Sequence, residues 1–433
     1  MISKNTMYKI VYIGYVSLAM GFEGINYSII APFFPIEARN KNVSKSLIGI
    51  IAGVFDISNI FGVFALPPIL SNKILFQIYI FGQLLSGINQ ILFGLLHYSP
   101  GGDLYVFNSI FSRFFGGIVS NLVWSTGYPL IIGIEPAWSS KTIAWIEIMM
   151  ALGVLIGPPT GSFLFQLGGY TFPFLANGTS QILMSVSLII LPNLTTNPST
   201  LNTKIDFGMF IKLLFNPKSL VFALSILSFN AVEGMLDVIS SPYLFNQLSV
   251  SEKTNGYIFG IMAAANLLSY CLFSVLIDKG YGGWVYLLSF SLFSMSSLIF
   301  FMQKWMNFLI NLWIVMICFI ITGVAAAGAN LSLYILVEKL IILNDITDLE
   351  GSKSLTGLYV NLYFSLGRLL GASVIGGFCY ENIGFFYTNG VETLLLIFSF
   401  SINIPIFAYF GFFNKIFYET SRENSNLSLD TFI

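Results

Sequence analysis

The sequence predicts an all-α membrane protein that crosses the bilayer many times, and three observations carry this prediction. The chain has 433 residues, of which 56% are hydrophobic and only 9% are charged. Soluble domains carry about 25% charged residues, so the shortage of charge is the stronger signal. The apolar residues also fall into long runs, each sufficient for a bilayer-spanning helix of about 20 residues.

Twelve such runs can be counted along the chain. At about 20 residues each, they leave only short loops and no room for a soluble domain. The first run is too long for a cleaved signal peptide and lacks a cleavage site, so we expect it to be the first spanning helix. The expected spans are residues 10–33, 47–70, 74–96, 104–130, 142–167, 172–192, 219–241, 255–277, 284–302, 309–337, 353–379 and 390–413.

Charge and rare residue types exclude several classes of function. The 19 Lys and Arg residues against 20 Asp and Glu residues provide no basic surface for nucleic acid. The three cysteines lie in apolar runs and His97 is the only histidine, so neither a disulfide framework nor a metal site is expected. No Walker A loop or nucleophile elbow occurs. We expect no enzyme activity and no cofactor.

The distribution of Lys and Arg predicts the orientation, because cytoplasmic loops carry the positive charge. If the N-terminus is cytosolic, twelve of these residues fall in cytosolic segments and five in the opposite loops, with Arg113 and Arg368 inside spans. Both termini are therefore expected in the cytosol. Three of the five exceptions lie in the loop between the first two spans.

The chain divides into two similar halves. The longest connection, residues 193–217, is rich in Asn, Thr, Ser and Pro and separates six spans from six. Residues 161–170 and 376–385 resemble each other at a distance of 215 residues, about half the chain. The alternative is chance similarity between two Gly- and Phe-rich spans. The expected organisation is a six-helix bundle over 1–192, a linker over 193–217, a second pseudo-symmetric bundle over 218–414 and a cytosolic tail over 415–433. Such halves are typical of transporters that bind substrate between them.

Acidic residues inside the spans are the first candidates for a substrate site, since a charge at the bilayer centre costs about 2.5–3.5 kcal/mol on insertion scales. Glu23 and Asp237 occupy nearly equivalent places in the two halves, and Glu233 lies one helical turn before Asp237. Buried neighbouring carboxyls can carry a proton. These three residues are the expected binding site for a small organic cation, and a structural hydrogen-bonding role is the alternative. Glu381 and Glu392, near span ends, are expected to be solvated.

Arginines in the spans are candidates for coupling. Arg113 can tune a neighbouring carboxyl, or it can be a structural ion pair. Arg368 opposes a purely cation-attracting site unless an acid such as Glu233 pairs with it. The role of Asp56 is left open between a substrate site and an interhelical hydrogen bond.

The fifth span carries Gly153, Gly157, Pro158, Pro159 and Gly161. Glycine at four-residue spacing allows close helix contact, and proline removes a backbone donor and bends the helix. We expect this segment to be a hinge or gate against a helix of the opposite half, with ordinary tight packing as the alternative.

These motifs resemble the major facilitator superfamily. Residues 153–161 resemble the helix 5 motif of its drug:proton antiporter branch, and Arg113 with Gly117 resembles the helix 4 arginine motif. Finer similarity is to the vesicular polyamine transporters, relatives of the vesicular monoamine and acetylcholine transporters, in residues 31–38, 152–161, 234–237, 276–279 and 376–385.

This resemblance implies exchange of luminal protons for a cytosolic amine. It assigns Asp237 and Glu23 to substrate, Glu147 with Arg113 to proton coupling, and Asp278 and Lys279 to a gate. The chain departs from the family after the second span, where residues 67–73 lack the Asp and Arg of the cytosolic gate motif, and at Arg368, where the monoamine carriers place an acid.

The predicted function is proton-coupled antiport of a polyamine-like or monoamine-like cation by alternating access, in a vesicle or organelle membrane or in the plasma membrane. The expected partners are the substrate, protons and the lipid bilayer, with the chain acting as a monomer. The alternatives are a facilitator or symporter for a neutral or anionic solute, anchored by Arg113 and Arg368, and a non-transporting scaffold or sensor.

Overall fold

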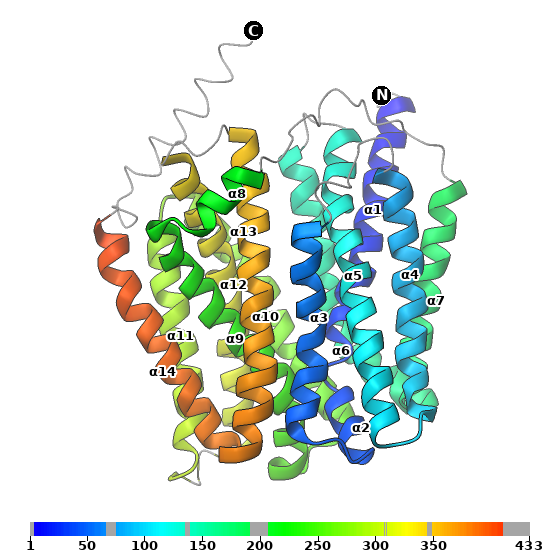
Figure 1. The fold of residues 1–433 in the computed structure, drawn as a ribbon, viewed down its shortest axis with the longest axis vertical. Coiled ribbons are helices and arrows are strands. Elements are labelled where there is room, and N and C mark those ends of the chain that lie inside the picture. Colours follow the sequence, from blue (N-terminus) through cyan, green and yellow to red (C-terminus); the bar gives the residue numbers. More distant parts are fainter. Residues whose placement is uncertain are drawn as a thin grey trace. The chain divides into compact units, whose positions relative to one another are not determined.

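The computed structural model in Figure 1 describes residues 4–65, 75–134, 139–190, 207–306, 308, 310–343 and 349–409. Within these residues every regular element is a helix. In chain order they are α1 (Lys4–Ser28), α2 (Phe34–Asn40), α3 (Lys45–Ala65), α4 (Leu75–Leu95), η1 (Leu96–Tyr98), α5 (Asp103–Ile134), α6 (Ser139–Gly168), α7 (Thr171–Ile190), α8 (Phe207–Leu214), α9 (Pro217–Leu248), α10 (Glu252–Asp278), α11 (Gly282–Met302), α12 (Leu312–Leu343), α13 (Leu349–Leu369), the π-helix η5 (Leu370–Cys379) and α14 (Tyr380–Tyr409).

Ten helical segments in the described residues are long and apolar enough to cross a membrane. One of them, Thr356–Ile404, runs for 49 residues and contains Gly384, whose backbone (φ 78°, ψ 174°) interrupts the helix. This segment covers two of the spans expected from the sequence. The 25-residue α1 is outside the ten, and its polar Glu23 and Asn26 reduce its hydropathy.

The chain forms two compact units that do not coincide with the two halves of the sequence. Unit 1 holds Met1–Thr203, Gly234–Ala263 and Arg368–Asn382, and unit 2 holds Lys204–Glu233, Ala264–Gly367 and Ile383–Ile433. Unit 1 therefore includes parts of α9, α10 and the α13–α14 region from the second half. The boundaries expected at 192 and 218 remain a prediction. The tail 415–433 and most of the linker lie outside the described residues, and the described end of the linker contains α8.

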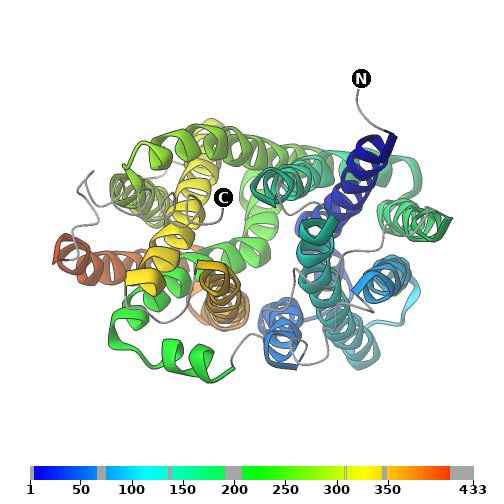
Figure 2. The same cartoon turned by 90° about the horizontal axis from the view of Figure 1, so that it is seen from above.

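Within unit 1, α1 packs on α6, α4 on α7 and α5, and α3 on α5 and η5. Figure 2 shows several of these helices nearly end-on. Small residues allow the closest approaches, since a Cβ on Gly153 would overlap the carbonyl oxygen of Gly21, and a Cβ on Gly24 that of Met150. The α1–α6 contact is therefore set by glycines on both helices.

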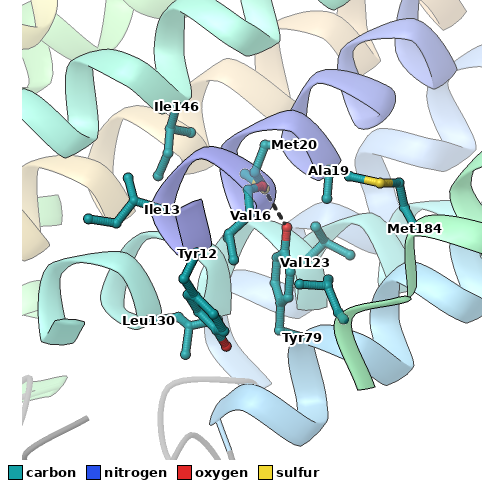
Figure 3. Close-up of a cluster of buried hydrophobic side chains, with 11 residues drawn as sticks. Tyr12, Ile13, Val16, Ala19, Met20, Tyr79, Val123, Leu130, Ile146 and Met184 are labelled. Atoms are coloured by element: carbon teal, nitrogen blue, oxygen red, sulfur yellow. Dashed lines mark hydrogen bonds between the residues drawn. The ribbon is translucent and has the colours of Figure 1, made fainter. Parts of the chain in front are cut away.

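The hydrophobic core of unit 1 surrounds the first half of α1 (Figure 3). Val16 and Met20 are fully enclosed by side chains from α4, α5, α6 and α7. The Tyr79 hydroxyl, on α4, reaches into this core and donates a hydrogen bond of 3.0 Å to the carbonyl oxygen of Val16. A buried hydroxyl needs such a partner, so this bond fixes the spacing between α1 and α4.

The helix is interrupted between α1 and α2, near Pro32, because a proline disfavours helical backbone in the residue before it. Two backbone carbonyls at this break accept hydrogen bonds from polar side chains of α9 and α10 in unit 1. Ser241 Oγ on α9 donates to the Ala31 carbonyl (2.9 Å), and Asn255 Nδ2 on α10 donates to the Pro32 carbonyl (3.1 Å). The end of the bundle at α2 is thereby tied to α9 and α10.

Candidate functional site

Charged side chains from four helices of unit 1 meet in one cluster. Arg368, at the end of α13, donates through Nη2 to Asp237 Oδ2 on α9 in a short ion pair. Its Nε lies 3.8 Å from Asp56 Oδ1 on α3. Arg113 on α5 interacts electrostatically with all three of these groups. The fold thus gathers two acids and two guanidinium groups that are distant in sequence.

Exposure differs sharply across this cluster. The Asp56 side chain is 4% exposed and that of Arg368 is 7% exposed, whereas the Asp237 side chain is 33% exposed. Buried charges are tolerated only with partners, and removing one partner leaves the other uncompensated. Asp237 is therefore the more exposed of the two acids in this cluster.

Backbone packing places Asp237 against Arg368. A Cβ on Gly234 would overlap the carbonyl oxygen of Arg368, so the absence of a side chain there lets α9 touch the chain at Arg368. The Arg368 guanidinium also lies 4.8 Å from the centre of the Tyr27 ring on α1, in cation–π geometry. Arg368, for which the sequence suggested an acidic partner such as Glu233, is therefore paired with Asp237, and Tyr27, which the sequence did not single out, supports it.

Arg113 is held by α3. Its Nη2 donates to the Ala52 carbonyl (3.3 Å) and its guanidinium lies 4.6 Å from the centre of the Phe55 ring. Gly117, one turn later on α5, lies so close to α3 that a Cβ would overlap Ser58 Oγ. The structure therefore explains the arginine–glycine pair seen in the sequence. Gly117 allows α5 to pack closely on α3, and Arg113 donates a hydrogen bond to the α3 backbone beside this contact.

Glu23 lies in a different polar cluster. Its side chain is 3% exposed, and Gln181 on α7 donates a short hydrogen bond to its Oε1. Gln181 also donates to Gln83 Oε1 on α4 (3.0 Å) and accepts from Asn26 (2.6 Å). The network links α1, α4 and α7 through amide side chains. The structure does not show Glu23 among the partners of Asp237, and its role in substrate binding remains a prediction.

The remaining expected acids have simpler placements. Glu233 is half-buried on α9, one turn before Asp237. Glu147 belongs to α6 and Asp278 ends α10, but their side chains lie outside the described part. Lys279 is exposed after α10. None of their expected roles is tested by these positions.

The glycines of α6 face a different neighbour from the one expected. A Cβ on Gly157 would overlap Ser28 Oγ of α1, and one on Gly161 would lie 2.8 Å from Ile29 Cγ1. Both neighbours belong to the same half of the sequence, not the opposite half. The expected placement of this face was wrong because spacing reveals a small-residue stripe but not which helix covers it.

The prolines of α6 do face the second half. A Cβ on Gly260 of α10 would lie 2.5 Å from Pro159 Cγ, and one on Gly256 would lie 2.8 Å from the Pro158 carbonyl oxygen. Ser162 Oγ donates a hydrogen bond to that same Pro158 carbonyl (2.9 Å). At these two glycines α10 therefore comes close to the backbone and proline rings of α6.

Glu392 is the clearest error of the sequence-based expectation. It was expected to be solvated, but it is 1% exposed on α14 and accepts a 2.7 Å hydrogen bond from Ser297 Oγ of α11. Its Oε2 has no hydrogen-bond partner in the described residues. Glu381 is exposed, as expected, and accepts hydrogen bonds from the backbone nitrogen and hydroxyl of Ser46.

Charged side chains between apolar helices of bilayer length are common in membrane transporters, and comparison with known proteins supplies the family. The family model "Major Facilitator Superfamily" matches residues 16–236, just over half of the chain. The MFS-type transporter SLC18B1 of Homo sapiens is 26% identical over 379 residues, covering 86% of this chain and 81% of that protein. SLC18B1 of Mus musculus is 26% identical over 388 residues, covering 87% and 81%.

Solved structures of transporters share the fold. The nucleoside transporter NupG superimposes with a TM-score of 0.69 at 13% identity, covering 94% of this chain and 99% of NupG. A bacterial homologue of the human lysosomal transporter Spinster, in an inward-facing and occupied conformation, gives 0.69 at 12% identity, covering 92% and 97%.

The chain belongs to the major facilitator superfamily. It is an all-α, multi-pass integral membrane transporter and not an enzyme, as the sequence predicted.

Proposed function

We propose that this chain is a proton-coupled antiporter that moves a small organic cation, a polyamine or a related amine, by alternating access. The partly exposed Asp237 is the observation that carries this proposal, because a carboxylate reachable by solutes inside a transporter is the natural counter-ion for an ammonium group. The similarity to SLC18B1 and the motif resemblance to vesicular amine carriers support the same substrate class.

Asp237 is the proposed primary contact for the substrate ammonium, and Glu233, one turn earlier on α9, is a second carboxyl on that face. Arg113 interacts electrostatically with Asp56 and Asp237, so it can influence when either acid holds a proton. Since a guanidinium stays charged in proteins, its part in coupling is to tune those carboxyls. Glu147 is the further acid assigned to proton coupling.

The ties at the α2 end are the proposed gate. Ser241, Asn255 and the α6–α10 contact at Pro159 join the first half to α9 and α10 within unit 1. Alternating access requires such contacts to separate once per cycle. The proposed setting is a vesicle or organelle membrane, with both termini cytosolic and the protein acting as a monomer.

A second candidate function is a facilitator or symporter for an anionic or neutral solute. Two guanidinium groups lie in the same cluster, and either could anchor a carboxylate or phosphate if Asp237 were displaced. The partly exposed member is the acid, which favours the cation carrier.

The test uses purified protein in liposomes with an imposed pH gradient, radiolabelled spermidine and an internal pH dye. We expect spermidine to accumulate only while the gradient lasts and to move protons in the opposite direction. Asp237→Asn should reduce uptake at least tenfold with the amount of folded protein unchanged. Uptake that ignores the gradient, or an Asp237→Asn variant with parental uptake, would refute the proposal.

A further inference from the structure

We infer that Arg368 is a tethered competitor of the substrate: its guanidinium occupies Asp237 when no substrate is bound and shifts to Asp56 when a substrate ammonium takes Asp237. This inference rests on the proposed function, since it assumes that Asp237 receives a cation. It makes Arg368 a positioning residue that already lies within ion-pair distance of both acids.

The geometry of Arg368 is asymmetric between the two acids. It holds a short ion pair with Asp237, whereas its Nε stands 3.8 Å from Asp56 Oδ1. A charge-assisted N–H···O bond is about 2.7–2.9 Å long, so the second pair is close without being bonded. A displacement of about 1 Å would complete it.

Asp56 can accept a further hydrogen bond from the displaced guanidinium. Its side chain is 4% exposed, and Oδ1 has no hydrogen-bond partner in the described residues. A buried carboxylate oxygen without a donor is costly, commonly by about 1–3 kcal/mol or more for a charged group. Moving the guanidinium onto Asp56 therefore offsets part of what is lost when it leaves Asp237.

Access distinguishes the two acids as well. The Asp237 side chain is 33% exposed, so a dissolved amine meets it directly, while Asp56 is enclosed and adjoins Arg368. The Tyr27 ring, 4.8 Å from the guanidinium carbon, can support the charge through the shift. The other charged groups to consider are Arg113 on α5, which acts on both acids, and Glu233, which lies one helical turn before Asp237 on α9.

Competition from Arg368 explains how the carrier releases a cation from Asp237. Without Arg368, Asp237 would hold an ammonium group until another cation arrived. With it, return of the guanidinium from Asp56 expels the substrate and restores the paired state. Binding is weakened by the competition, and release is correspondingly accelerated.

The experiment measures spermidine binding to purified full-length protein for Arg368→Gln, Asp56→Asn and the double variant. Arg368→Gln should bind about tenfold more tightly than the parent, which corresponds to about 1.4 kcal/mol. Asp56→Asn should bind about tenfold more weakly, because Arg368 then lacks a second carboxylate to pair with when the substrate occupies Asp237. In the Arg368→Gln background, Asp56→Asn should have little further effect.

Arg113→Gln is the matched control, since it removes the same charge from the same cluster without touching Asp237. A general electrostatic effect predicts equal tightening by Arg113→Gln and Arg368→Gln, and additive effects of Asp56→Asn in both backgrounds. Either result, or weaker binding by Arg368→Gln, would overturn the inference. If Arg368→Gln does not fold, Arg368→Lys in both Asp56 backgrounds should show the same non-additivity at smaller size, and additivity would again refute it. A parent that binds no spermidine refutes the proposed function itself.

Discussion

Glu23 and Glu392 are buried carboxyl side chains in different compact units, and their surroundings differ. Glu23 receives a hydrogen bond from Gln181, which is itself linked to Asn26 and Gln83. Glu392 receives one hydrogen bond, from Ser297, and its second oxygen is unpartnered in the described residues. Burial alone therefore says little about how much the hydrogen bonds of an acid contribute to the stability of a membrane protein.

The internal repeat makes this comparison sharper. An offset of 215 residues maps Glu392 of the second half onto Asn177 of the first. Asn177, on α7, donates a short hydrogen bond to Asn26 and so belongs to the Glu23 network. The first half therefore has an amide, Asn177, in a network that joins α1, α4 and α7. The second half has an acid, Glu392, at the equivalent position, where a single hydrogen bond joins α14 to α11. We expect the first network to be needed for folding and the second carboxyl to be replaceable.

The largest expected effect is that of Glu23→Leu. Leucine removes the acceptor of Gln181 and leaves a buried amide network short of one partner, which we expect to cost about 2–4 kcal/mol of unfolding free energy. The measurement is denaturant-induced unfolding in detergent micelles. A loss below about 1 kcal/mol would show that the network is dispensable and would remove the contrast with Glu392.

Gly157→Leu tests whether glycine packing, rather than the polar network, holds α1 in unit 1. The side chain would enter the space of Ser28, and overpacking of this kind costs about 1–3 kcal/mol. The same unfolding measurement applies. Gly14→Leu on α1 is the control, since a Cβ there meets nothing within 4 Å.

Counterflow on the same preparations separates packing from gating. Gly256→Leu on α10 would wedge the contact with Pro158 and Ser162, so we expect spermidine binding to persist while exchange is lost. If Gly157→Leu instead binds normally and fails to exchange, its glycine face acts as a gate, although it packs against α1 and not against a helix of the opposite half.

Glu23→Gln distinguishes a structural role of Glu23 from the substrate contact predicted by the sequence. Glutamine can still accept a hydrogen bond from Gln181, so we expect a loss of about 1 kcal/mol or less. Because the side chain is 3% exposed and already engaged, spermidine uptake should remain within about threefold of the parent. Abolished uptake by a folded variant would restore Glu23 to the substrate site.

Glu392→Leu should have the smallest effect. Replacing a poorly partnered buried polar group by a hydrophobic residue of similar size is often neutral or stabilising, so we expect a change within about 1 kcal/mol. Glu392→Gln, which preserves the hydrogen bond from Ser297, is the matched variant. If Glu392→Leu lowered the unfolding free energy by several kcal/mol while Glu392→Gln left it unchanged, Glu392 would contribute as much to stability as Glu23.

Hydropathy and small-residue spacing were enough to predict most of the spans and the close packing of α6. These are local properties, because a bilayer selects for helix length and apolar content whatever the neighbours are. The predicted 255–277 and 284–302 match α10 and α11 to within three residues at each end. The acids Glu23 and Asp237 also stood out, because charge is rare inside spans.

The error at Glu392 has a local cause. The last span was expected to begin at residue 390, which places Glu392 at its end, whereas the helix of α14 is interrupted at Gly384 and resumes directly after it. Glycine tolerates the left-handed backbone at that point, so helix resumes where the sequence suggests a loop. Glu392 consequently lies several turns inside the segment, facing α11.

Only the tertiary structure decided which charges pair. Arg368 meets Asp237 and approaches Asp56 because glycine lets α9 touch the chain at Arg368 and because α3 packs on the adjoining π-helix. No pattern within a single helix specifies such a contact, since the side chains come from helices far apart in sequence. The sequence alone determined that charges within the spans would be costly, because their cost in lipid is a property of each residue, while the burial and the partner of each charge depend on helix packing.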